Sequence, residues 1–339
     1  MQRLRRRLRH AGHYTVYVVL RVFLCILQTT DLQSCDRICR LVAWILADLT
    51  RVRRSIIDEN LNRVYPDLAP RQRRLLRKSM WHHLLLMLCE IAHAPRKIHR
   101  CTWLNHFRMR NKSMMVRSII ADHPTLLTTG HFGNFEIAGY AMGVFGIPAA
   151  TVARPLDNPI ADAYLTQFRC SGGQVIFPKD GSAHLIQEHL ERRGNLAILA
   201  DQFAGSKGVW IEFFGHPTSC HKAVALFVLS AGATMSVTYN RRLGRPLRFE
   251  LGCIDVCSPN VAGRQSTPPH LQSVESLTEW YNAQLEASIR LAPEQYWWLH
   301  RRWREVPASA LRRLQRRREQ NRTIQSPSDA PPPVDRSAA

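Results

Sequence analysis

The most informative stretch of the sequence is Thr128-Thr129-Gly130-His131-Phe132-Gly133-Asn134-Phe135-Glu136. The residues that lead into it, 125–129, are Thr and Leu, a composition typical of a short buried strand. Gly130 and Gly133 then indicate a turn, and a helix with Glu136 in its first turn is expected to follow. The stretch therefore predicts a strand, a turn that carries His131, and a helix.

Similar strand and helix patterns alternate along the chain after Pro124. The other expected strands span 149–153, 174–177, 196–200, 210–213 and 234–240, and a further helix spans 223–231. This alternation predicts an α/β fold with a mostly parallel central sheet flanked by helices. Ligands of such sheets bind at the carboxyl ends of the strands. His131 and Asp201, which follow two of the expected strands, are both candidates for that position.

The N-terminal region combines arginines with two apolar stretches, 14–27 and 38–49. No small-residue cleavage site follows the first stretch, and Arg21 interrupts it, so it does not read as a cleaved signal peptide. We expect residues 1–50 to form a helical membrane anchor, either one tilted span or a helical pair in the interface. An ordinary amphipathic first helix of a soluble protein remains the alternative.

The charge of the chain is strongly positive. It has 339 residues with 47 Lys and Arg against 26 Asp and Glu, a net charge of +21. Such a balance predicts an anionic partner, which can be nucleic acid, a membrane surface, or a phosphorylated substrate or carrier protein. No helix-turn-helix, zinc-finger spacing or aromatic RNA-binding run supports nucleic acid. The nine cysteines lack metal-site spacing, so no metal is expected.

Residues 304–339, rich in Arg, Ser and Pro, are expected to be a disordered tail after a catalytic domain of residues 51–303.

His131 and Glu136 form the candidate catalytic pair. A carboxylate on one ring nitrogen fixes the imidazole tautomer and raises the basicity of the other nitrogen, as a general base for a hydroxyl requires. The backbone amides near Gly133 and Asn134 are candidates for binding a developing oxyanion. A packed histidine beside an unrelated glutamate is the alternative.

Several blocks, in order along the chain, carry a resemblance to a known family. They are His131-x-x-x-x-Glu136, Asn60-Leu61 with Tyr65-Pro66, Ala153-Arg154-Pro155 with Asn158, Asp201-Gln202 with Gly208 and Phe213-Phe214-Gly215, and Gln295-Tyr296-Trp297-Trp298-Leu299-His300-Arg301-Arg302-Trp303. Together they resemble the lipid A biosynthesis acyltransferases, the lauroyl and myristoyl transferases of Gram-negative inner membranes. The last block fits either a membrane interface or a buried aromatic latch.

The resemblance implies transfer of a fatty acyl chain to a hydroxyl of a lipid A precursor or a similar glycolipid, at the cytoplasmic face of the inner membrane. The donor would be a thioester of acyl carrier protein or coenzyme A, and no cofactor is implied. The resemblance also implies that His131 is the general base and that Glu136 is its orienting partner. The chain lacks a G-x-S-x-G elbow and has no cysteine near His131, so direct transfer without a covalent intermediate is expected.

Three further residues are candidates for substrate binding. Arg154 is expected beside His131, where it would hold a phosphate or phosphopantetheine. Asp201 would pair with Arg154 or bind the acceptor hydroxyl, and Asn158 reads as a helix cap or a ligand. The segment 219–223 departs from the family pattern, so another glycolipid or a lysophospholipid remains an alternative acceptor.

Overall fold

A computed structural model of the protein describes residues 2–258 and 271–325. Its strands are β1 (Phe107–Arg110), β2 (Thr125–Thr129), β3 (Ala149–Ala153), β4 (Val175–Pro178), β5 (Asn195–Leu199), β6 (Val209–Phe213), β7 (His216–Cys220), β8 (Thr234–Arg242) and β9 (Phe249–Cys257). Its helices are α1 (Gln2–Thr29), α2 (Leu32–Trp44), α3 (Arg54–Val64), α4 (Pro70–Lys97), α5 (Lys112–Ile120), α6 (Phe135–Val144), α7 (Pro159–Ser171), α8 (Ala183–Glu191), α9 (Lys222–Ala231), α10 (Val274–Arg290) and α11 (Ala308–Gln325). Shorter helical segments are η1 (Ile45–Leu49), η2 (Trp103–Asn105) and η4 (Pro293–Gln295).

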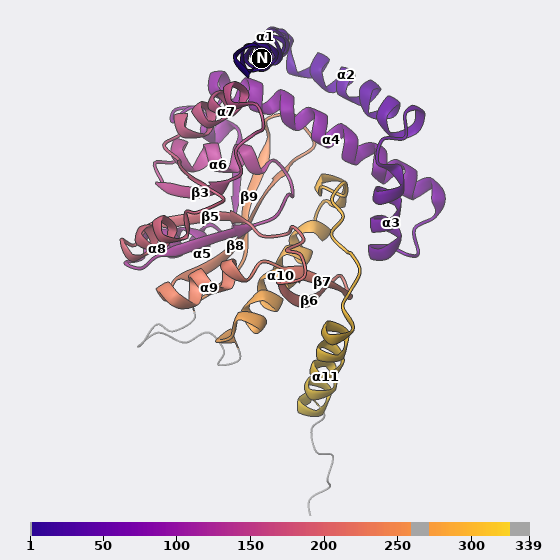
Figure 1. Ribbon diagram of the computed structural model, residues 1–339, viewed down its shortest axis with the longest axis vertical. Helices are drawn as coiled ribbons and strands as arrows, with labels where there is room; N and C mark the ends of the chain where they lie inside the picture. The colour runs from indigo at the N-terminus through magenta and orange to yellow at the C-terminus, as the bar shows by residue number, and fades with distance from the viewer. Residues whose placement is uncertain (1, 259–270, 326–339) are drawn as a thin grey trace, which may run out of the picture.

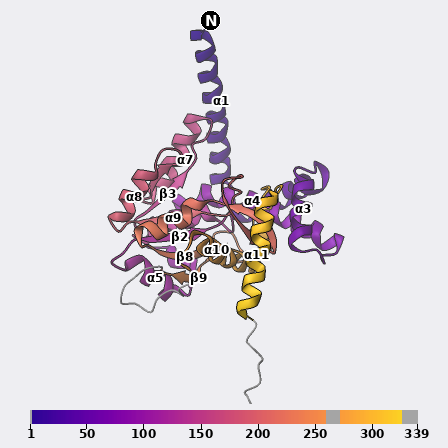
Figure 2. The ribbon, with the colours of Figure 1, turned by 60° about the horizontal axis from the view of Figure 1, so that its bottom comes forward.

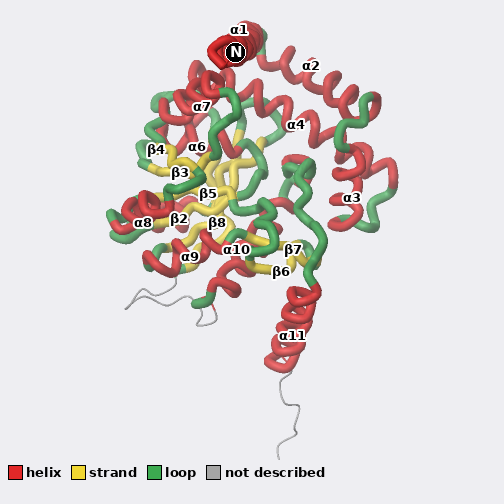
Figure 3. The backbone as a smooth tube through the Cα atoms, in the orientation of Figure 1, coloured by secondary structure: helices red, strands yellow, loops and turns green. Residues whose placement is uncertain are grey.

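Within the described residues, a seven-stranded sheet has the strand order β1-β9-β8-β2-β5-β3-β4. Its neighbouring strands are parallel except for the antiparallel pair β8 and β9. This confirms the α/β class with a mostly parallel sheet flanked by helices (Figure 3). The short edge strand β1 and the strand β9 were not among the strands expected from the sequence, and neither was β7.

The expected strand 210–213 belongs to a separate β-hairpin rather than to the main sheet. As β6 it pairs antiparallel with β7 in a two-stranded hairpin outside the main sheet. Phe214 and Gly215 connect the two strands with positive φ angles of 51° and 72°. Two consecutive positive φ angles are typical of the tight turn that joins antiparallel strands, so this segment could not continue the parallel alternation.

Helices cover both faces of the sheet because each strand buries side chains in both directions (Figure 1). Leu126 of β2 packs into a cluster that includes residues of α8, α9 and α10. Its neighbour Leu127 points the opposite way and packs with residues of α5 and α6. The central strand β2 is thus buried on both sides, which fixes the turn that follows it.

The N-terminal helix α1 stands out from the body of the protein (Figure 2). The segment His10–Thr29 is long and apolar enough to cross a membrane, and it is not buried against the protein. Val19 and Ile26 are 63% and 57% exposed on this helix, and Ile38 and Leu41 of α2 are similarly exposed. The structure therefore has a candidate N-terminal anchor.

The basic C-terminal region is helical where it is described. Helix α11 spans Ala308–Gln325 and extends from the end of the protein opposite α1 (Figure 2). Ala310 and Leu314, one turn apart, are buried, and Arg317 forms an ion pair with Glu279 of α10. The structure thus has a helix in part of the tail for which the sequence predicts disorder, and packing and ion pairs stabilise this helix. Residues 326–339 lie outside the described residues.

Candidate active site

The register between β2 and β5 brings His131 and Asp201 together. Thr129, the last residue of β2, pairs with Leu199, the last residue of the parallel strand β5. His131 and Asp201 each follow two residues later, so they leave the same edge of the sheet side by side. Gly130 permits the close approach, because a Cβ there would lie 3.0 Å from an oxygen of Asp201.

Asp201 holds the histidine by two contacts. Its Oδ1 accepts a hydrogen bond from Nδ1 of His131 at 2.7 Å, and its Oδ2 accepts one from the backbone N–H of His131 at 2.8 Å. A proton on Nδ1 leaves the lone pair on Nε2, which is the form that a general base needs.

The protonation of this pair follows from burial and charge. Burial lowers the pKa of His131, but the charge and hydrogen bond of Asp201 and the charge of Glu136 outweigh burial and raise that pKa above its ordinary value. Burial likewise raises the pKa of Asp201, yet the nearby His131 lowers it overall, so the carboxylate stays ionised. The site therefore holds a buried anion that supports a more basic imidazole.

Glu136 does not make the expected contact with His131. Its carboxylate forms a two-pronged ion pair with Arg169 of α7, in which Nε lies 3.0 Å from Oε2. Glu136 lies in the first turn of α6 and its carboxylate faces α7, whereas Asp201 follows β5, the strand next to β2. The expectation that Glu136 is hydrogen-bonded to the imidazole is therefore wrong, and its influence on His131 is electrostatic.

The backbone amides expected to bind an oxyanion are already engaged. The N–H of Gly133 donates to the carbonyl of Gln295, and the N–H of Asn134 donates to the carbonyl of Asn240, both at 2.9 Å. Amides that donate to backbone carbonyls cannot also receive a developing charge. Gly133 and Asn134 instead fix the turn: Gly133 has φ +62°, and the Asn134 side chain caps α6 by accepting from the N–H of Ile137.

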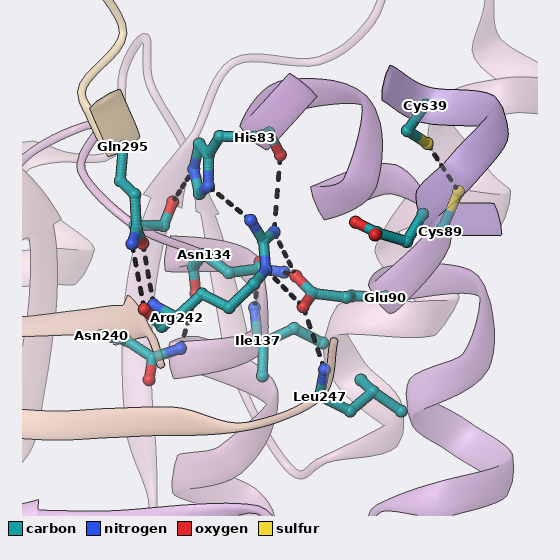
Figure 4. A network of polar contacts seen from close by, with 12 residues as sticks. Cys39, His83, Cys89, Glu90, Asn134, Ile137, Asn240, Arg242, Leu247 and Gln295 are labelled. Carbon is teal, nitrogen blue, oxygen red and sulfur yellow. Dashed lines mark hydrogen bonds and ion pairs between the residues drawn. The ribbon is translucent and has the colours of Figure 1, made fainter. Parts of the chain in front are cut away.

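A buried ion pair lies beneath this turn (Figure 4). The carboxylate of Glu90 in α4 binds the guanidinium of Arg242 in β8 through two contacts of 2.6 Å. Glu90 also accepts from the Asn134 side chain at 2.9 Å and from the backbone N–H of Leu247 at 3.0 Å. The network thus connects α4 and β8 to the cap of α6, two residues from the Glu136 position and three from His131.

His83 completes this network. Arg242 donates to its Nδ1 at 2.9 Å, and its Nε2 faces the carbonyl of Gly133 at 3.3 Å (Figure 4). Burial and the charge of Arg242 hold the pKa of His83 well below its ordinary value, so the ring is neutral. The turn that carries His131 therefore rests on a buried network of hydrogen-bonded polar groups.

A cavity of about 290 Å³ opens in front of the imidazole. Its lining residues are Arg53, His131, Asp201, Gln202, Trp297, Leu299 and His300. The side-chain amide of Gln202 lies 3.3 Å from Nε2 of His131. Burial lowers the pKa of His300 to about 4, and this ring accepts the backbone N–H of Phe203, so it is neutral. The reactive nitrogen of His131 thus faces an open space rather than the core.

The aromatic and basic block near the C-terminus is mostly a buried latch. Trp298 and Arg302 are fully buried, and Trp303 is 5% exposed. The Arg302 guanidinium donates to the carbonyls of Gln202 and Ser219 at 2.8 and 3.0 Å. Trp297 is half-buried, and its backbone N–H donates to the carbonyl of His131 at 3.0 Å. Of the two interpretations left open by the sequence, the structure supports packing over a membrane-facing belt.

Arg154 and Asn158 lie outside the cavity. Strand β5 lies between β2 and β3, so Arg154 is two strands away from His131, and its side chain is 75% exposed beside Asp157. The expectation that it neighbours His131 and pairs with Asp201 is wrong because strands consecutive in the chain are not adjacent in the sheet. Asn158 caps α7 by accepting from the N–H groups of Ile160 and Ala161.

The sequence did not identify Asp201 as the partner of His131, although one signal was present: both residues follow expected strands, and the carboxyl ends of parallel strands lie at one edge of the sheet. Arg53 and His300 carried no such signal, because they come from distant parts of the chain. Glu90 and Arg242 are 152 residues apart, and their pairing depends on the tertiary fold.

Two comparisons with known proteins identify the family of this chain. The family described as bacterial lipid A biosynthesis acyltransferase matches residues 1–305. The lipid A biosynthesis lauroyltransferase of Escherichia coli (strain K12) is 24% identical over 263 residues, which are 75% of this chain and 80% of that protein. The chain belongs to the bacterial lipid A biosynthesis acyltransferase family and is an acyltransferase.

Proposed function

We propose that the protein transfers a fatty acyl chain from a thioester to a hydroxyl of a lipid A precursor, with His131 as the general base and Asp201 as the residue that orients it. The observation that carries the proposal is the imidazole itself. Its Nδ1 is bound to the buried Asp201, and its Nε2 faces a cavity of about 290 Å³. Glu136 raises the basicity of the ring from a distance rather than by contact.

The reaction needs one proton transfer at Nε2. The acceptor hydroxyl gives its proton to Nε2 of His131 while its oxygen attacks the thioester carbonyl carbon, and a new C–O bond forms. The C–S bond then breaks, and the protonated ring returns the proton to the departing sulfur. A thioester is already activated, so no covalent enzyme intermediate is required.

Gln202 is the side chain best placed to respond to this reaction. Its amide lies 3.3 Å from Nε2 at the cavity wall, where the acceptor hydroxyl would bind. An arriving hydroxyl would displace it, and the freed N–H groups can then donate to the thioester oxygen as negative charge develops. This role would replace the one expected of the Gly133 and Asn134 amides, which donate elsewhere.

A second, mostly apolar cavity lies beside the Glu136–Arg169 pair and measures about 110 Å³. Phe135 lines it, and the ring of Phe135 lies 5.1 Å, between centroids, from the imidazole of His131. We propose that the first carbons of the acyl chain enter here. Ala138, which also lines it, offers a test: Ala138→Leu fills the cavity and should favour shorter acyl donors.

We also propose a location at the bacterial inner membrane, with the catalytic domain on the cytoplasmic side; the apolar helix α1 supports attachment to a membrane. The segment His10–Thr29 would be the anchor, and the exposed Ile38 and Leu41 of α2 would contact the lipid surface. Acyl carrier protein or acyl-CoA would supply the chain. Partition of the full chain into the membrane fraction checks the anchor, and deletion of residues 2–29 should release it.

The function is tested by mass spectrometry of lipids from a deletion strain, together with transfer by the purified full chain in detergent. Loss of one acyl chain from lipid A in the deletion strain, restored by the wild-type gene and not by His131→Ala, is the expected result. Restoration by folded His131→Ala would contradict the assignment of the base. A change confined to another glycolipid or to phospholipids would contradict the acceptor.

A further inference from the structure

Arg53 places a permanent positive charge in the cavity that faces His131. It belongs to the turn between η1 and α3, and its side chain lines the cavity together with Gln202 and Trp297. Its guanidinium donates from one terminal nitrogen to the carbonyl of Leu299 at 3.2 Å. This contact holds the group at the cavity wall and leaves other N–H donors of the guanidinium free to bind a ligand.

The backbone that presents Arg53 is strained. Arg51 and Arg53 have φ angles of 55° and 50°, in the left-handed region that residues with side chains rarely occupy. Such conformations persist where the surrounding structure enforces them, and they concentrate at functional sites. A turn that holds two residues in this conformation within three positions constrains the backbone from which the exposed Arg53 side chain reaches the cavity.

No acidic side chain in the described part of the chain neutralises the charge of Arg53. Among the described residues, no carboxylate forms an ion pair with its guanidinium, and Asp201, the acid that lines the same cavity, is bound to His131. His300 is neutral at pH 7, since burial lowers its pKa to about 4. An unpaired guanidinium beside a reactive histidine is suited to an anionic part of a substrate.

We infer that Arg53 binds a phosphate group of a substrate and thereby positions that substrate in front of His131; the inference rests on the proposed acyl transfer. Guanidinium and phosphate match in a two-pronged, charge-assisted hydrogen bond. The phosphate can come from the 4′-phosphopantetheine arm of the donor or from a phosphorylated acceptor glycolipid. Arg154, the residue expected from the sequence to have this role, is 75% exposed and lies outside the cavity.

The test compares substrates with and without the phosphate. Donors are an acyl-4′-phosphopantetheine and the same acyl-pantetheine; acceptors are a phosphorylated glycolipid and its dephosphorylated form. Full-length wild type, Arg53→Ala, Arg53→Lys and the control Arg51→Ala are assayed in detergent for KM and kcat. Arg51 shares the turn, the charge and the left-handed backbone but does not line the cavity.

Arg53→Ala should raise KM about 10- to 100-fold for the phosphorylated form of one substrate, the size of a lost charge-assisted contact. KM for its phosphate-free form should stay close to that of the wild type, and Arg53→Lys should recover part of the loss. The substrate whose KM responds, donor or acceptor, is the source of the phosphate that Arg53 binds. An equal rise in KM for substrates with and without phosphate would show that Arg53 only makes a structural contact to Leu299, and would overturn the inference. An unchanged KM for every substrate would overturn it as well.

A binding titration keeps this result separate from the proposed function. If the wild-type protein transfers no acyl chain, the proposed reaction fails, but calorimetry with 4′-phosphopantetheine against pantetheine, and with the phosphorylated against the dephosphorylated glycolipid, still measures binding. A preference for phosphate that Arg53→Ala removes and Arg51→Ala keeps supports the inference. Absence of any preference in the wild type overturns it.

Discussion

Replacing Asp201 with asparagine tests whether this carboxylate orients the base. Its two oxygens accept from Nδ1 and from the backbone N–H of His131 at 2.7 and 2.8 Å. An asparagine of the same shape offers one acceptor oxygen and one NH₂ group. If the oxygen keeps the backbone N–H, the NH₂ group faces Nδ1 and favours the tautomer with its proton on Nε2. That tautomer has no lone pair toward the cavity.

The expected loss is large because the base itself is disabled. General base catalysis contributes about 10²- to 10⁴-fold, so kcat of Asp201→Asn should fall by that factor. In activation free energy, the loss is roughly 2.7–5.4 kcal/mol. The free energy of unfolding should fall by less, about 1.5–3 kcal/mol, which is the contribution of one charge-assisted hydrogen bond.

Glu136→Gln is the matched comparison. It keeps both contacts of Asp201 and removes only a distant charge, so kcat should fall much less than in Asp201→Asn. Its main effect should be on stability, because Arg169 is left without its partner. Side chains of the pair are 20% and 15% exposed, so a cost of up to about 3 kcal/mol is expected. Adding Arg169→Met should recover most of it.

The assay measures kcat with a saturating acyl thioester and acceptor in detergent, alongside thermal unfolding of each variant. Asp157→Asn is the control, since Asp157 is exposed and its nearest ion pair is with Arg154 at 3.7 Å. The reasoning is refuted if Asp201→Asn works close to the wild-type rate while folded Glu136→Gln is as inactive as His131→Ala.

Three further predictions concern the same site. The pKa of His131 is raised above 6.5, and the ring is protonated and inactive at pH values below this pKa, so kcat/KM should rise with pH through a pKa above 6.5. Asp201→Asn removes the charge that raises this pKa and leaves the burial that lowers it. The rise in kcat/KM should therefore move to lower pH in this variant. Glu90→Gln should lower the free energy of unfolding by about 3–5 kcal/mol in denaturant titration, because Arg242 keeps a buried charge without its partner, whereas Asp157→Asn should not. Gly133→Ala should destabilise more than Gly146→Ala in thermal unfolding, since both have positive φ but only at Gly133 would a Cβ lie 2.0 Å from the carbonyl oxygen of Asn240.

Part of this protein is determined locally and was predictable from the sequence. The strands 125–129 and 149–153 were expected with the bounds that β2 and β3 have, because their composition and flanking turns are local properties. The motif around His131 placed the histidine at the end of a strand, and the ordered blocks indicated the family that the comparisons show. Composition, flanking turns and short motifs are set by residues close together in the sequence, so they do not depend on which strands become neighbours.

The partners of the functional side chains were decided by tertiary structure. The chain passes from β2 to β3, yet β5 inserts between them, so Asp201 rather than Arg154 reaches His131. Glu136 is five residues from His131, but α6 turns its side chain toward Arg169 of α7. Strand order and helix packing minimise exposed apolar area over the whole chain, and no window of sequence contains that information. The type of each element followed from local residues, whereas the pairing of charges followed from the global burial of the core.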